Sequence, residues 1–140
     1  MWMAFPLLVI PVVVYNLVAL GSAATSSMAT TPDQGLREPL FSVPMASGVN
    51  WNVGSGDLII LVSLILLFFE LLKSTNTQKV AIINHALSMI LFIICLVEFL
   101  LLPGFATSTF FLVTVMVLLD VLAGFIVTII AARKDFEFGA

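Results

Sequence analysis

The stretch VAIINHALSMILFIICLVEFLLL, residues 80–102, is apolar over a length that can cross a lipid bilayer. About 20 helical residues, each rising ~1.5 Å, span a hydrocarbon core of ~30 Å. At helical spacing, Asn84, Ser88, Cys95 and Glu98 follow one another along a single face. Because lipid offers polar groups no hydrogen-bond partner, this stripe is expected to face other helices or a water-filled cavity.

The composition of the 140 residues is that of an integral membrane protein. Hydrophobic residues make up 61% of the chain and charged residues 9%, whereas soluble domains carry about 25% charged residues. The mean hydropathy is +1.24. A net charge of -3 with only five Lys and Arg gives no basic footprint for nucleic acid. The length fits one transmembrane domain, residues 1–140, without a soluble catalytic module.

Four apolar segments are predicted to cross the membrane. They cover about residues 1–20, 57–73, 79–102 and 108–132, and residues 21–56 form the one long loop. The polar connection between the second and third segments is short, so these two are expected to be antiparallel neighbours. Pro103 and Gly104 end the third segment. The predicted fold is an all-α membrane four-helix bundle with up-down-up-down topology.

The first segment contains Pro6 and Pro11, and each removes an intrahelical hydrogen-bond donor. We expect kinks in the first helix at these positions. A cleaved signal peptide is the alternative, because small residues follow at 21–24. Since a positively charged region before the apolar run is missing, we interpret residues 1–20 as a retained helix.

The second half of the long loop, residues 36–51, mixes apolar residues and prolines with Trp51. Such a segment suits the membrane surface, where an amphipathic ring can sit among headgroups. We expect it to pack against the bundle. Residues 21–35 are equally compatible with a plain flexible loop.

The basic residues near the span ends predict the orientation, because cytoplasmic loops retain Lys and Arg. Lys73, Lys79, Arg133 and Lys134 fall on one side of the four-span arrangement, and Arg37 alone falls on the other. Both termini are therefore predicted to be cytoplasmic.

Three acids and one histidine lie inside the predicted spans: Glu70, Glu98, Asp120 and His85. A charged side chain at a helix centre costs about 2.5–3.5 kcal/mol on insertion scales, so each needs a partner, water or a proton. Glu70 can pair with Lys73 at i+3, and both can reach toward the interface. Glu70 and His85 have similar depths on consecutive helices, so a contact between them is also expected.

Asp120 lies about midway along the last span, and Gly124 and Thr128 follow it at i+4 and i+8. This stripe of small residues permits a close approach of another helix. No Lys or Arg lies at that depth. The acid is then protonated, solvated, paired with a cation from another chain, or hydrogen-bonded; the candidate partners are Asn84, Ser88 and Ser63. Each of these residues can be interpreted either as a packing residue or as a functional one.

Several chemistries are excluded by the residues present. One histidine cannot ligate haem from both sides, and His85 with scattered acids lacks the spacing of a zinc site. The single Cys95 excludes an intrachain disulfide. No glycine-rich phosphate loop or nucleophile elbow is present. We therefore expect no catalytic residue, metal site or cofactor, and a protein that is not an enzyme.

Several runs of the chain resemble a group of small bacterial inner-membrane proteins. These runs are LFSVPM at 40–45, GDL at 56–58, LLFFELLK at 66–73, HALS at 85–88, VEFLL at 97–101, ATSTFF at 106–111 and DVLAGF at 120–125. The resemblance implies a multi-pass location in the bacterial inner membrane and brings no activity with it. The small multidrug transporters are similar in size and span number, but their key carboxylate lies in the first helix, and residues 1–20 contain none.

Three functions are compatible with these features. The leading hypothesis is a non-enzymatic accessory or assembly subunit that docks on a larger membrane complex or on copies of itself. The competing one is a proton- or cation-linked transporter or channel, in which the staggered Glu70, His85, Asp120 and Glu98 form a relay. The third is binding of a quinone, lipid or pigment tail between helices. The expected partners are membrane lipid and a membrane protein or second copy, and no nucleic acid.

Overall fold

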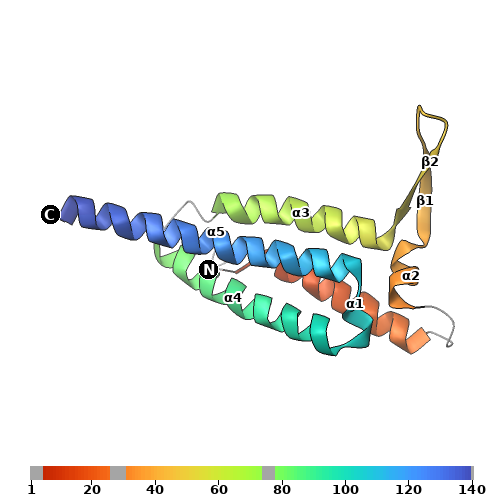
Figure 1. The fold of residues 1–140 in the computed structure, drawn as a ribbon, viewed down its shortest axis with the longest axis horizontal. Helices are drawn as coiled ribbons and strands as arrows, with labels where there is room; N and C mark the ends of the chain where they lie inside the picture. The colour runs from red at the N-terminus through yellow and green to blue at the C-terminus, as the bar shows by residue number, and fades with distance from the viewer. Residues whose placement is uncertain (1–4, 26–30, 74–77, 140) are drawn as a thin grey trace.

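The structure is a computed structural model of the chain and describes residues 5–25, 31–73 and 78–139. It is mostly helical, with two short strands (Figure 1). In chain order the elements are α1 (Val9–Thr25), α2 (Pro32–Arg37), β1 (Pro39–Pro44), β2 (Asn50–Gly54), α3 (Ser55–Lys73), α4 (Gln78–Leu101), the 3-10 helix η2 (Pro103–Phe105) and α5 (Ser108–Gly139).

Three of the helices, α3, α4 and α5, are long and apolar enough to cross a membrane. The shorter apolar helix α1 lies alongside them (Figure 1). The C-terminus and the two helix ends joined by residues 74–77 lie toward one end of the molecule, whereas α2 and the strands lie at the other.

The helix α5 packs against both α3 and α4, and it lies between them in Figure 1. The two helices expected to be direct neighbours therefore pack on α5 rather than on each other. A hydrogen bond between Glu70 and Asn84 joins them. The expectation failed because a short connection restricts only the distance between the two joined helix ends.

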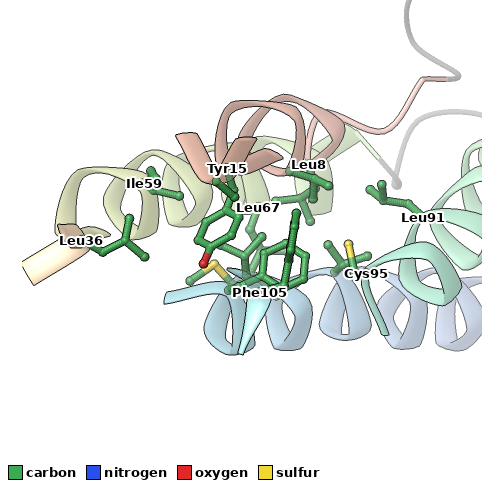
Figure 2. Packing of buried hydrophobic residues seen from close by; sticks show 14 residues of the cluster. Leu8, Tyr15, Leu36, Ile59, Leu67, Leu91, Cys95 and Phe105 are labelled. Carbon is green, nitrogen blue, oxygen red and sulfur yellow. The ribbon is translucent and has the colours of Figure 1, made fainter. Parts of the chain in front are cut away.

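The apolar core lies where α1 packs against the other helices (Figure 2). Tyr15 of α1 is 1% exposed. Its ring centroid lies 5.3 Å from that of Phe105 and 4.7 Å from that of Phe110. Its hydroxyl lies 2.6 Å from Thr107 Oγ1 and donates to the carbonyl of Gly104 at 3.1 Å. These contacts tie α1 to the connection between α4 and α5.

The first helix begins later than the predicted segment and ends later. Residues 5–8 precede α1, which continues to Thr25, and residues 1–4 lie outside the described part of the chain. Pro11 is the third residue of α1. Backbone N–H groups in a first helical turn have no intrahelical acceptor, so this proline costs the helix no hydrogen bond. Pro6 precedes the helix altogether.

Residues 21–56 do not form one irregular loop, and here the all-α prediction is incomplete. After α1 and α2 the chain forms an antiparallel hairpin, in which Phe41 pairs with Val53 and Val43 pairs with Trp51. Gly48, between the strands, has φ +83°, which glycine adopts far more readily than other residues.

The hairpin packs on the helices only at its base. The whole of β1 is exposed, whereas Val53 and Gly54 at the end of β2 are buried. A Cβ added at Gly54 would lie 2.5 Å from the carbonyl oxygen of Leu36, so glycine allows β2 to pass close to α2. The predicted packing of residues 36–51 against the bundle is therefore wrong for most of this segment.

Candidate functional site

The polar stripe predicted on α4 faces the other helices. Asn84 is 5% exposed, Ser88 1% and Cys95 0%, whereas Ile83 and Ile90 are exposed. Because polar side chains point inward and large apolar ones outward, the spacing in the sequence predicted the buried face of α4 correctly.

Glu70 of α3 is fully buried and lies at the centre of a hydrogen-bonded cluster. Its Oε1 accepts from Asn84 Nδ2 at 2.5 Å, and its Oε2 accepts from the backbone N–H of Leu7 at 2.8 Å. Lys73 Nζ lies 3.0 Å from the same carboxylate and donates to the carbonyl of Phe5 at 2.6 Å. The cluster joins α3, α4 and the segment before α1.

This cluster differs from the predicted contacts of Glu70. The ion pair with Lys73 is present, but Glu70 is buried rather than directed to the interface. Its partner on α4 is Asn84 and not the adjacent His85. The observed partner is thus one residue away from the predicted one. Successive residues on a helix point about 100° apart, so a small error in helix rotation exchanges one neighbour for the other.

Asp120 of α5 is 4% exposed, and its Oδ2 accepts a hydrogen bond from Ser88 Oγ at 2.5 Å. Ser88 is thus the one of the three candidate partners that bonds to the acid. The amide of Asn84 bonds to α3, and Ser63 Oγ donates to the carbonyl of Ile59 in its own helix at 2.7 Å. The mid-span acid therefore has a partner inside its own chain.

Gly124 permits a close contact between α4 and α5. A Cβ at this position would lie 2.6 Å from Nδ1 of His85. The small-residue stripe ends there, because Thr128 is exposed and its hydroxyl donates to the carbonyl of Gly124 at 2.8 Å. The structure therefore brings Gly124 to the contact between helices and leaves Thr128 outside it.

A cavity of about 10 Å³ lies between α4 and α5. Its lining residues are Ala81, Asn84, His85, Ser88, Asp120, Gly124 and Val127. Two buried atoms of this lining, Asn84 Oδ1 and His85 Nδ1, have no hydrogen-bond partner among the described residues. Buried polar groups are nearly always paired, and a polar cavity of this volume is about the size needed for one water molecule. The site therefore suits a water molecule.

Glu98 lies apart from this site. Its Oε2 accepts from Asn16 Nδ2 of α1 at 3.3 Å, and the same Nδ2 donates to the carbonyl of Val12 at 3.0 Å. Glu98 is half-buried and ten residues beyond Ser88 on α4, about 15 Å along the helix axis. Of the four ionisable groups predicted inside the spans, the structure thus brings His85 and Asp120 to one cavity and separates Glu98 from them.

The sequence reasoning missed two partners from the N-terminal part of the chain. These are the N–H of Leu7, which bonds to Glu70, and the side chain of Asn16, which bonds to Glu98. The signal for the first was Pro11. Since proline fits the first turn of a helix, it predicts a start near residue 9, which leaves the N–H of Leu7 available.

The described residues contain no group of three or more His, Cys, Asp and Glu side chains that could hold a metal ion. The fold and the site define a mostly helical protein in which three helices could cross a membrane and acidic side chains are buried between helices. No family model matches the chain, and no curated protein or solved structure is significantly similar to it.

Proposed function

We propose that the chain is an integral protein of the bacterial inner membrane with four spans, α1, α3, α4 and α5, and with cytoplasmic termini. The inward polar and outward apolar side chains support this, since they are arranged for lipid rather than water. The 17 residues of α1 cover about 26 Å, so residues 5–8 must complete its crossing. Lys73, Arg133 and Lys134 mark the cytoplasmic side.

We further propose that the protein is a non-enzymatic accessory or assembly subunit, which docks on a larger membrane complex or on a second copy. The observation that carries this proposal is the exposed C-terminal part of α5, residues 132–139. With 32 residues, α5 is about 48 Å long and extends past the other helices (Figure 1). Every residue from 132 to 139 is exposed, including Phe136 at 83% and Phe138 at 90%. Exposed aromatic side chains of this kind are enriched where proteins bind one another.

Replacing Phe136 and Phe138 together by alanine is expected to weaken the assembly at least about tenfold, the effect of ~1.4 kcal/mol of binding free energy. Native mass spectrometry of a gentle membrane extract measures it. The matched control is the double alanine variant of Leu100 and Leu101, which are 67% and 72% exposed on α4. We expect that control to assemble like the wild type. A strictly monomeric wild type, or equal assembly of both variants, would refute the docking role.

The cavity beside Asp120 favours a second candidate function, proton- or cation-linked transport. Polar side chains lead from Lys73 through Glu70 and Asn84 to this cavity. On the other side of Asp120, Val117 and other apolar residues of α5 are fully buried. The geometry thus favours a binding site that is reached from the cytoplasmic end.

Flux through reconstituted vesicles tests the transport role with a pH-sensitive dye and with cation-selective dyes. We expect Asp120→Asn to abolish flux, because the amide keeps the size of the side chain but can neither ionise nor exchange a proton at the cavity. Glu98→Gln changes an acid outside the cavity and should leave flux unchanged. Transport is excluded if the wild type carries no flux or if Asp120→Asn carries as much.

A further inference from the structure

The β1–β2 hairpin has one apolar face. In its register, Phe41 lies opposite Val53 and Val43 lies opposite Trp51. Because side chains alternate between the two faces of a strand, these four residues share one face. We refer to Phe41, Val43, Trp51 and Val53 as the apolar face of the hairpin.

The opposite face is polar in its middle, with Leu40 beside it at the irregular end of β1. Ser42 lies opposite Asn52, and its hydroxyl bonds to Asn52 Oδ1 at 2.6 Å. Asn50 lies on the same side, opposite Pro44. No residue from 39 to 54 carries a charge. The hairpin is therefore amphipathic without any group that would recognise a charged partner.

The apolar face is only partly covered by the chain. Val53 is 4% exposed, at the point where β2 packs against α2 and α3. Phe41 and Trp51 are 50% and 56% exposed, and Val43 is 36% exposed. An isolated two-stranded hairpin is at best marginally stable in water. A further surface that covers these three side chains would stabilise it.

The position of the hairpin indicates what that surface is. The strands run across the axes of the long helices, at the end of the molecule where α3 begins (Figure 1), and Gly54 directly precedes Ser55 of α3. When α3 crosses a bilayer, the hairpin then lies along the bilayer surface. Leu58 and Leu61, in the first turns of α3, are exposed as well. Tryptophan is enriched at this depth of a membrane.

We propose that the apolar face of the hairpin binds the lipid surface on the extracytoplasmic side, with Phe41, Val43 and Trp51 among the lipid headgroups and upper acyl chains. The polar face, with Ser42 and Asn52, contacts water. The hairpin thereby anchors the N-terminal end of α3 at the interface. This inference rests on the proposed membrane-spanning arrangement, and it assigns the uncovered face to lipid rather than to a protein.

Nitroxide labels on adjacent residues of opposite faces test the proposal. In a Cys95→Ala background, Val43→Cys and Ser42→Cys are labelled, and the protein is reconstituted in bilayers. Electron paramagnetic resonance then measures collisions with oxygen, which concentrates in lipid, and with a neutral nickel chelate, which stays in water. We expect oxygen to dominate at Val43 and the chelate to dominate at Ser42. Ile90→Cys, on the exposed face of α4, is the control for a spanning position.

Each other outcome overturns the proposal in a recognisable way. Strong collisions with the chelate at both hairpin positions would place the hairpin in water. Protection of Val43 from both reagents would show that a protein covers the apolar face. Collisions with the chelate at Ile90 would instead refute the membrane-spanning arrangement, so the two failures are distinguishable.

Discussion

Replacing Glu70 by alanine is expected to destabilise the fold by about 3–5 kcal/mol, the cost of removing one partner from a buried ion pair. Glu70 is fully buried, and its carboxylate accepts from Lys73, from Asn84 and from the N–H of Leu7. Alanine leaves all three donors without this acceptor. Because the side chain of Lys73 is 15% exposed and can regain some water, we expect the lower part of the range. Unfolding in mixed micelles with increasing dodecyl sulfate measures the change.

The matched control is Glu98→Ala. This acid is half-buried and accepts one longer hydrogen bond, at 3.3 Å from Asn16, so its loss should cost less than about 1.5 kcal/mol. Glu70→Gln keeps the size of the side chain and one acceptor, and it should fall between the two alanine variants. Equal losses for the two alanine variants would show that the cluster around Glu70 does not stabilise the packing of α1, α3 and α4.

The sequence predicted the long helices well, because the length and spacing of apolar residues depend on local structure. The predicted spans 57–73 and 79–102 are close to the observed α3 and α4. The last predicted span ends near residue 132, whereas the helix α5 continues to Gly139. Charged residues marked where the apolar span ends, but nothing in this stretch stops a helix. Hydropathy therefore predicts the apolar span and not the end of the helix.

The sequence analysis did not predict the hairpin, because prolines flank the short alternation of apolar and polar residues in β1. Pro39 and Pro44 are the two ends of β1, and proline in an apolar run usually argues against a strand. At strand ends and on a free edge, however, the missing N–H costs no ladder hydrogen bond. The alternation of Phe41, Ser42 and Val43 was the available signal for a strand with one apolar face.

The sequence predicted part of the candidate site along the helix axes, but it did not predict how α4 is rotated about its own axis. Counting residues along the helices identified Ser88 as one possible partner of Asp120, and the two side chains are hydrogen-bonded. It could not show that Asn84 rather than His85 turns toward α3. That rotation depends on how α4 packs against α5, and the contact between His85 and Gly124 is part of this packing.

Gly124→Leu is accordingly expected to destabilise the fold by about 3 kcal/mol, the upper end of the usual cost of overpacking. A Cβ at residue 124 would lie 2.6 Å from Nδ1 of His85, 3.2 Å from its Cγ and 3.4 Å from its Cβ. Leucine adds three more carbon atoms beyond this Cβ, at a point where the helices already approach closely, so α4 and α5 must separate even if the ring of His85 rotates. Separation would also lengthen the 2.5 Å hydrogen bond between Ser88 and Asp120. The same micelle unfolding assay measures the loss.

Gly21→Ala is the control for the effect of glycine in a helix. A Cβ at Gly21 meets no atom within 4 Å, so alanine there should be neutral or stabilise by up to about 1 kcal/mol. Gly124→Ala, by contrast, is expected to destabilise the fold. In a His85→Ala background that penalty should largely vanish, because the ring that the new methyl group meets is gone. A double-mutant cycle should therefore give a coupling of at least about 1 kcal/mol between the two positions. If Gly124→Ala costs as much without the ring as with it, His85 does not set the separation of α4 and α5.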